Sequence, residues 1–251
     1  MKHIKLRQLA AGVVLCAAQA ASALNTFGTD MSDLWFNAAE SGWGINIAHQ
    51  REIVFATLFV YGTDNRTRWY VAPDMSTPGG PLPTVFNGNL YETQGPFLGG
   101  TFNPTAVTNR QVGTARLTFN EVSRGTLVYT VDGVSVTKQI ERQTFRGANL
   151  AGIYRGSAIA TVAGCSTNGF QTTGLLSVTH NSANAVSILA SLDNGFNCTY
   201  TGTYAQAGRM GAITGGSFTC TQGPTTSTGT FQASEIEAGY GGMIMRYETR
   251  Y

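Results

Sequence analysis

The side chains that could act as nucleophile, general base or metal ligand are few and far apart in this chain. The sequence has three histidines, and His49 and His180 lie in different halves of it. A serine nucleophile needs a base within hydrogen-bonding distance. Ser41, between Glu40 and Gly42, also lacks the G-x-S-x-G turn of hydrolases. We therefore expect no Ser–His catalytic pair.

Paired carboxylates are the other catalytic arrangement that the residue types allow. Glycoside hydrolysis uses two acids about 5 to 10 Å apart on one cleft, and Asp33 and Glu40 are near each other in sequence. Glu235 and Glu237 would share one face of a strand, where solvent exposure is the simpler interpretation. A glycan-active hydrolase using Glu40 is therefore kept as an alternative. The cysteines come with no Cys-x-x-Cys spacing or histidine pair, so we expect no metal and no cofactor.

All three tryptophans, Trp35, Trp43 and Trp69, lie within residues 35–69. Tryptophan is large and amphipathic, so such a cluster indicates either a packing centre or a stacking surface for a ligand. Concave ligand sites combine apolar faces with a few directional polar groups. The predicted ligand-binding residues are Trp35, Asn37, Glu40, Trp43, Asn46, Arg68 and Trp69. The competing interpretation is structural, with the segment 42–44 plugging one end of a barrel.

The first 23 residues predict a secretion signal rather than part of the fold. Lys2, Lys5 and Arg7 precede an apolar run over 9–18, and small residues at 21–23 match an A-x-A cleavage site. The run is too short for a membrane-spanning helix, which needs about 20 apolar residues, and no later apolar segment approaches that length. We expect a secreted or periplasmic protein that does not insert into the membrane.

The charge of the mature chain argues against nucleic acid as a partner. The leader holds three of the 16 basic residues, so 13 remain against 14 acidic ones. Phosphate backbones are bound by clustered lysine and arginine, and Lys138 is the only lysine after the leader. Charged residues make up 12% of the chain, about half the usual share. Neutral, hydroxyl-rich ligands such as glycans suit such a surface.

Cys165, Cys198 and Cys220 follow the leader, and disulfides persist in exported proteins. Three pairings are possible. We favour Cys198 with Cys220, opposite each other in a hairpin closed by residues 207–211, with Cys165 free or bonded to another chain. This register also aligns similar residues across the strands, namely Tyr200 with Phe218 and Gly202 with Gly216.

The wider pattern is that of antiparallel β-structure, because turn residues recur about every ten positions between β-branched and aromatic runs. The clearest hairpin spans 125–140, where Asp132 and Gly133 supply the positive φ angles of a two-residue turn. That turn places Lys138 opposite Leu127, on the face that also carries Tyr129. An inward lysine could contact a ligand, whereas a lysine near a strand end extends its ammonium group to solvent. Both interpretations stay open.

Two units are expected after the leader, a tryptophan-containing one over 24–147 and a Cys-, Gly- and Thr-rich one over 148–251. The first is predicted to have eight strands, which suits a lipocalin- or avidin-like up-and-down barrel, with a β-sandwich as the alternative. Its strands are predicted at 43–48, 53–61, 67–71, 86–91, 99–102, 114–119, 125–131 and 134–140. Those of the second are predicted at 152–160, 174–180, 185–192, 198–204, 212–220, 229–236 and 242–247.

The segment from Trp35 to Gly44 resembles a group of secreted bacterial β-rich proteins with the opening W-W/F-N-x-x-E-S-G-W-G. The stretches 198–209 and 215–220 are similar to the Cys- and Gly-rich second module of that group. The resemblance covers most of the mature chain. It implies export and a two-part β architecture, and it supplies no catalytic residue.

These observations favour a non-enzymatic binding protein for a small neutral ligand or glycan. The alternatives are a cell-surface structural or adhesive β-protein, since strands without lysine leave their edges open to pairing, and the hydrolase using Glu40. The sequence leaves ligand identity and oligomeric state open.

Overall fold

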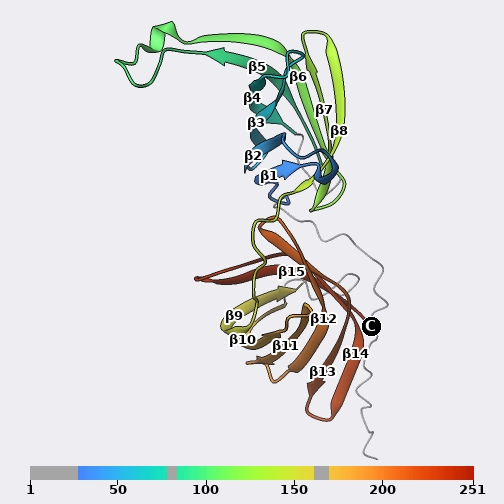
Figure 1. Cartoon of the computed structure of the whole chain (residues 1–251). Coiled ribbons are helices and arrows are strands. Elements are labelled where there is room, and N and C mark those ends of the chain that lie inside the picture. Colours follow the sequence, from blue (N-terminus) through green and yellow to red (C-terminus); the bar gives the residue numbers. More distant parts are fainter. Residues whose placement is uncertain (1–27, 78–83, 161–169) are drawn as a thin grey trace, which may run out of the picture.

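The computed structural model describes residues 28–77, 84–160 and 170–251, with the side chains of 160 and 170 left aside. The expected leader and Cys165 lie outside the described residues. The chain forms two antiparallel β units, as expected (Figure 1). Strands β1 to β8 close into a barrel in sequence order, and β9 to β15 form a seven-stranded sheet, also in sequence order. Among the described residues, no helix has the length and hydropathy to cross a bilayer.

The first unit is an up-and-down barrel whose inward residues form one apolar core that includes Trp35, Phe86 and Phe119. Two short 3₁₀ helices, η1 (Ala38–Glu40) and η2 (Pro104–Ala106), interrupt the loops. Its strands are β1 (Asp33–Phe36), β2 (Gly44–Gln50), β3 (Ile53–Tyr61), β4 (Thr67–Ser76), β5 (Thr84–Gln94), β6 (Thr108–Phe119), β7 (Arg124–Val131) and β8 (Val134–Arg142).

Eight strands were expected, but one expected position is wrong. Residues 99–102 lie in the loop between β5 and η2. Pro96 and Pro104 flank this stretch, and proline cannot donate to a strand ladder. The barrel is closed instead by β1, which pairs with β2 and with the end of β8, where Trp35 lies opposite Arg142.

The second unit has its seven strands where the sequence indicates, each somewhat longer than predicted or the same length. They are β9 (Gly152–Ala160), β10 (Phe170–His180), β11 (Ala185–Leu192), β12 (Asn197–Ala207), β13 (Met210–Gln222), β14 (Thr225–Gly239) and β15 (Gly242–Arg250). The segment 143–151, between β8 and β9, joins the two units.

The register that the turn at Asp132 and Gly133 predicts for β7 and β8 is confirmed. Asp132 and Gly133 have φ angles of 46° and 84°, and Leu127 pairs with Lys138 as expected. Lys138 shares the inward face with buried Leu127, yet its side chain is one-third exposed. The lysine therefore starts on the inner face and reaches out of the barrel end.

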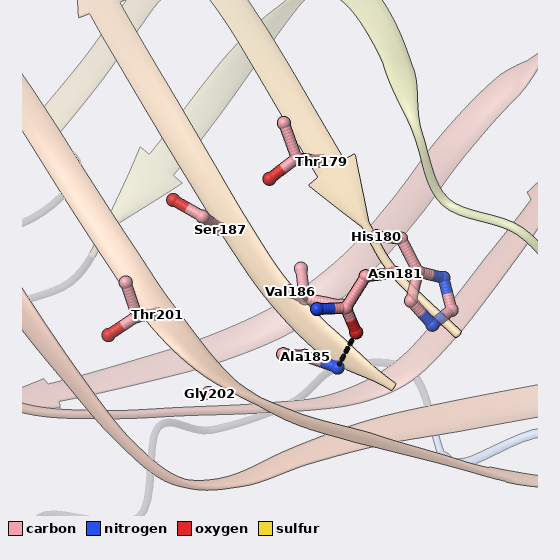
Figure 2. Close-up of a pocket in the computed structure, with 8 residues that line it drawn as sticks. All are labelled: Thr179, His180, Asn181, Ala185, Val186, Ser187, Thr201 and Gly202. Carbon is pink, nitrogen blue, oxygen red and sulfur yellow. Dashed lines mark hydrogen bonds between the residues drawn. The ribbon is translucent and has the colours of Figure 1, made fainter. Parts of the chain in front are cut away.

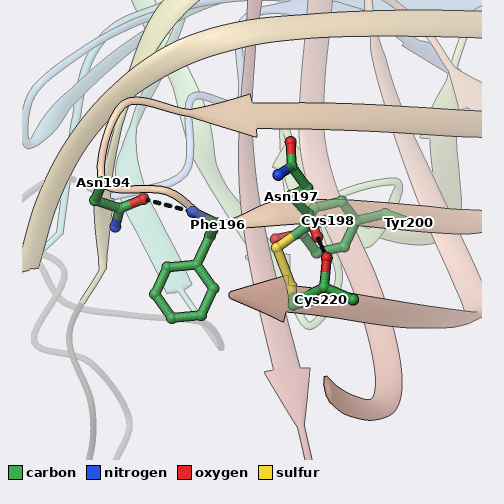
Figure 3. Close-up of a disulfide and its surroundings, with 7 residues drawn as sticks. Asn194, Phe196, Asn197, Cys198, Tyr200 and Cys220 are labelled. Atoms are coloured by element: carbon green, nitrogen blue, oxygen red, sulfur yellow. Dashed lines mark hydrogen bonds between the residues drawn. A yellow bond between two sulfur atoms is a disulfide. The ribbon is translucent and has the colours of Figure 1, made fainter. Parts of the chain in front are cut away.

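The cysteine hairpin is also confirmed at its open end, where Cys198 and Cys220 form a disulfide (Figure 3). Two details differ from expectation. The turn is formed by residues 208–209, because Ala207 already pairs with Met210. The expected pairing of Gly202 with Gly216 is replaced by a bulge between Thr201 and Thr203, at Gly215, whose φ angle is 64°.

The two units open with the same arrangement of hydrogen bonds. In the first unit, buried Met31 donates its N–H to His49 Nδ1 (3.1 Å), and its carbonyl accepts from Trp35 Nε1 (2.9 Å). In the second, buried Leu150 donates to His180 Nδ1 (3.2 Å), and its carbonyl accepts from Tyr154 Oη (2.9 Å). In both units the aromatic donor comes four residues after the apolar residue.

The loop after the third strand of each unit repeats as well. Asp64 Oδ1 accepts from the Arg66 N–H, just as Asn194 Oδ1 accepts from the Phe196 N–H. The loops have the same closing backbone bonds, with 62 and 66 corresponding to 192 and 196. Strand β4 therefore corresponds to β12, and Arg68 lies at the position of Cys198.

Arg209, in the β12–β13 turn, joins the second unit to the end of the barrel. Its backbone N–H donates to Asp33 Oδ2 (3.0 Å) and its guanidinium pairs with Asp30 and with Glu237. Its neighbour Gly208 leaves no room for a side chain, because an added Cβ would lie 2.1 Å from Asp33 Oδ2.

Candidate ligand groove

The three tryptophans have different surroundings. Trp35 lies in the barrel core, and Trp69 is exposed. Trp43 is held by Glu40, which pairs with Lys138, and we call this set of contacts the latch. Trp35 is fully buried and packs against Phe119 with ring centroids 4.8 Å apart. The Arg142 guanidinium carbon lies 4.6 Å from the Trp35 ring centroid. A ligand cannot reach this indole without opening the barrel, so we correct the expectation that Trp35 contacts ligand. Its role is packing.

Trp43 is half-buried in the loop between η1 and β2, and two charged residues hold it at the barrel end. Its Nε1 donates to Glu40 Oε2 (3.2 Å), and Lys138 Nζ lies 2.7 Å from the same oxygen. The Lys138 ammonium is 6.0 Å from the centroid of the Trp43 ring. Trp43 also packs against the barrel core. These contacts match the structural interpretation of a plug at one barrel end.

Lys138 sets the ionisation of Glu40. The hydrogen bond from Lys138 lowers the pKa of the Glu40 carboxyl below its usual value of 4.5. A depressed pKa means that this contact is present above the unfolded value and is lost as the pH falls through the folded one. A general acid in glycoside hydrolysis needs a raised pKa instead. Asp33, the expected second carboxylate, bonds to Arg142 and Arg209. The structure does not support this pair as hydrolase acids.

Replacing Lys138 by methionine should raise the pKa of Glu40 toward 4.5, because the ammonium donor is gone. In a pH titration followed by NMR, the Trp43 indole N–H should then respond at higher pH than in the wild type. Lys138→Arg, which keeps the charge, is the control and should titrate like the wild type. An unchanged titration in Lys138→Met would show that the latch does not exist in solution.

The two candidate asparagines, Asn37 and Asn46, line neither of the two hollows described below. Asn37 caps η1, since its Oδ1 accepts from the Ala39 N–H and its Nδ2 donates to the Gln139 carbonyl. Asn46 is exposed on β2 opposite Thr57 of β3. The structure therefore assigns Asn37 a capping role and brings neither asparagine into contact with Trp69.

Trp69 is the exposed tryptophan, with 53% of its surface accessible. It lies on β4 in a groove with a cavity volume of about 370 Å³. The six residues that line the groove are Thr67, Arg68, Trp69, Glu92, Thr93 and Gln94. Of the seven expected ligand-binding residues, Arg68 and Trp69 are the two found there. The others belong to the core, the latch, the cap or the outer face of β2.

One exposed aromatic side chain of β3 lies beside the groove. Phe59 lies directly opposite Trp69 in the β3–β4 ladder and is 38% exposed. Phe55 and Tyr61 are exposed on the same outward face of β3. Hydrophobic runs on both faces of 52–61 suggested a central strand, and β3 does have neighbours on both sides. Its outward residues, however, remain open to solvent.

Strands β4 and β5 have no registered pair beside the groove. Their pairing is registered at Val71 with Tyr91 and at Ser76 with Asn87, and not along 67–69. In the corresponding hairpin of the second unit, pairing continues to Asn197 with Thr221. There the disulfide joins the strands at the position of Arg68. The disulfide therefore joins β12 to β13 in the second unit, whereas the corresponding strands β4 and β5 have no registered pair at this end.

The charged groups around the groove are already paired within the protein. Arg68 Nη2 lies 2.8 Å from Asp64 Oδ2. Glu92 accepts from Arg110, which also binds Asp132 in the β7–β8 turn. These two carboxylates raise the pKa of the Arg110 guanidinium. The groove thus offers polar atoms of both signs with no single unbalanced charge.

A second hollow of about 400 Å³ lies on the second unit, lined by Thr179, His180, Asn181, Ala185, Val186, Ser187, Thr201 and Gly202 (Figure 2). Its lining holds hydroxyl groups and no exposed indole or phenol ring. His180 there already accepts a hydrogen bond from the Leu150 N–H, and its ring makes a T-shaped contact with the ring of Tyr204. We therefore place the candidate site at the Trp69 groove. Among the described residues, no group of three potential metal-ligating side chains occurs.

Comparisons with protein-family models, curated proteins and solved structures found no match to this chain. We therefore infer the function from the geometry of the groove.

Sequence reasoning missed Phe59 and the β5 side of the groove, Glu92, Thr93 and Gln94. No residue type distinguishes these positions from other strand ends. They could have been found only from the pairing of β4 with β5. Residues 92–94 follow Tyr91 on β5, the strand next to β4, which carries Trp69.

Proposed function

We propose that this protein is an exported, non-enzymatic binding protein that recognises a neutral, hydroxyl-rich ligand such as a glycan in the Trp69 groove. The observation that carries the proposal is an indole more than half exposed within a polar-lined hollow. Exposed large apolar groups beside a concavity are typical of interaction sites.

The chemistry of the groove suits a sugar ring. An aromatic face attracts the slightly positive C–H bonds of a ring, because its π-system is negative above the plane. Arg68, Glu92 and Gln94 supply donors and acceptors at the rim for hydroxyl groups. Because Arg68 and Glu92 already have counter-charges, a neutral ligand can bind without separating an ion pair.

Titration against a panel of neutral oligosaccharides, followed by tryptophan fluorescence and calorimetry, tests the proposal. A binding glycan should change the emission of the wild type, because Trp69 lies in the site. Trp69→Ala should weaken binding about ten- to hundredfold, the usual effect of losing a central aromatic contact. Phe55→Ala is the matched control, since Phe55 is exposed on the same barrel face but outside the groove lining. It should bind like the wild type.

Equal loss of affinity in both variants would place the ligand elsewhere on the aromatic face. Unchanged affinity in Trp69→Ala would exclude the groove as the binding site.

A further inference from the structure

The loop between β5 and β6, residues 95–107, projects from the barrel near the end that lies away from the second unit (Figure 1). We call this loop the arm. Its residues Phe97 and Leu98 are 84% and 80% exposed, and Phe102 and Val107 are exposed on the same loop. Exposed apolar groups that lie together are typical of a surface that contacts another molecule or a membrane.

The arm carries no charge. From Thr93 to Asn109 the sequence contains no aspartate, glutamate, lysine, arginine or histidine. The charged residues nearest in sequence, Glu92 and Arg110, pair with each other at the base of the arm, and Arg110 also binds Asp132. Taking an isolated charge out of water is costly. The arm can therefore enter an apolar medium without that cost.

Several backbone groups of the arm are satisfied within it. Pro96 and Pro104 have no N–H to satisfy. The Gly100 N–H donates to the Phe97 carbonyl (3.3 Å), and the Asn103 side chain caps η2. An unsatisfied backbone group is expensive away from water. These local bonds lower the cost of removing the arm from water.

A lipid surface suits the arm better than a protein pocket does. Every residue from Phe97 to Gln111 is exposed, so the arm is a projection and not a flat patch. A protein partner would need a matching apolar cavity, and the two hollows that a second copy would offer are rich in polar side chains. A bilayer interface needs no such fit. It takes up apolar side chains among the acyl chains and leaves hydroxyl and amide groups at the level of the headgroups.

We propose that the arm docks this protein on the surface of a lipid bilayer, with Phe97 and Leu98 entering the outer part of the acyl region. The contact is shallow, and no part of the chain spans the bilayer in this arrangement. Anionic lipids are bound through clusters of lysine and arginine, which the arm lacks. Zwitterionic lipids therefore suffice, and the contact does not depend on the Trp69 groove.

Flotation with phosphatidylcholine vesicles tests this inference. The wild type should bind at about 5 mM lipid, as expected of a weak, reversible anchor. Replacing both Phe97 and Leu98 by alanine should weaken binding at least about tenfold, because the apolar surface that leaves water is lost. The control replaces Ile153 and Ile159 by alanine, which removes two similarly exposed apolar side chains from β9. It should bind like the wild type.

Salt separates this contact from an electrostatic one. The bound fraction of the wild type should not fall between about 0.1 M and about 1 M sodium chloride, because salt screens only charged contacts. A wild type that does not float, binding that is lost at high salt, or equal binding by the arm variant and the wild type would overturn the proposal. So would a wild-type dimer that the arm variant loses in light scattering, since the arm would then contact a second copy.

A fluorescent label reads the position of the arm directly. In a Cys165→Ser background, Leu98→Cys carrying an environment-sensitive fluorophore should shift its emission to the blue when vesicles are added. The same label on Ile153→Cys should not shift. A shift at Ile153 without one at Leu98 would contradict the proposal. Circular dichroism confirms that each variant is folded.

Discussion

Replacing Arg142 by methionine is expected to destabilise the barrel by about 3 to 5 kcal/mol, the usual cost of removing one partner from a buried charged network. The Arg142 side chain is fully buried at the end of β8. Burial, and to a lesser extent the nearby Arg209, lowers the pKa of its guanidinium, while Asp33 opposes that shift. Such a charge is tolerated in a core only when its donors are satisfied.

The donors of Arg142 are satisfied by the segments that close the barrel. Nε donates to the Val122 carbonyl (2.7 Å), and Nη2 donates to the Asp30 carbonyl (2.6 Å). Nη1 donates to the Ser32 carbonyl (3.0 Å) and to Asp33 (3.2 Å). Methionine fills part of the volume but removes the donor from the Val122 and Asp30 carbonyls, while Ser32 and Asp33 keep their bonds from Arg209. The loss falls where β1 meets β8, so closure of the barrel depends on it.

Chemical denaturation followed by tryptophan emission measures this effect, because every tryptophan lies in the first unit. Arg124→Met is the control. Arg124 is exposed in its strand, and exposed substitutions typically change stability by less than about 0.5 kcal/mol. A change below 1 kcal/mol in Arg142→Met would show that the network does not hold β1 in place.

Removing the disulfide, by replacing Cys198 and Cys220 with alanine, should destabilise the second unit by about 3 kcal/mol. The bond closes a loop across a sequence separation of 22 residues. In the chain-entropy account, opening such a loop stabilises the unfolded chain by about that amount. Cys198 is also buried, so alanine leaves a small cavity that adds to the loss.

Hydrogen exchange separates the two units in this experiment. Amides of β12 and β13 should lose protection in the double variant, while the tryptophan emission transition of the barrel should stay where it is. Equal loss of stability in both units would show that they unfold together through the Arg209 contacts. No loss in either would contradict the stapling role of the bond.

Local sequence signals predicted those parts of the fold that depend on local geometry. The turn at Asp132 and Gly133 determines the register of β7 and β8, because a two-residue loop admits one pairing. Cys198 and Cys220 were found because residue types match across one hairpin. Between 150 and 251, regular spacing of turn residues located every strand.

The errors arose where distant contacts decide the structure. Residues 99–102, Gly-Gly-Thr-Phe, were expected to form a strand, but they pair with no strand. Phe97 and Leu98 in the same loop are 84% and 80% exposed. Strand β1 has only four residues. Its pairing with β8 joins the two ends of the first unit, and no local sequence pattern predicts a contact over that separation. Which tryptophan is buried depends on Arg142, 107 positions after Trp35, and on the closure that it stabilises.

Of the residues that the sequence predicted for the ligand site, only Arg68 and Trp69 lie at the proposed groove. Aromatic residues with polar neighbours were expected to bind together around the segment 35–44, whereas the groove draws on β4 and β5. Arg68 and Trp69 come before Val71, where the registered pairing of β4 with β5 begins, and Glu92 to Gln94 come after Tyr91, the partner of Val71. A bulge or a parting of strands is set by ladder geometry, which residue types alone do not determine.

The indole N–H resonances of the three tryptophans give the most direct test of the central claim, that a ligand binds at Trp69 on the outer face of the barrel. In an NMR titration with a binding glycan, the Trp69 indole signal should move in proportion to occupancy. The Trp35 signal should stay fixed, because its Nε1 is buried and bonded to Met31. Movement of the Trp35 or Trp43 signal with Trp69 unchanged would contradict the account.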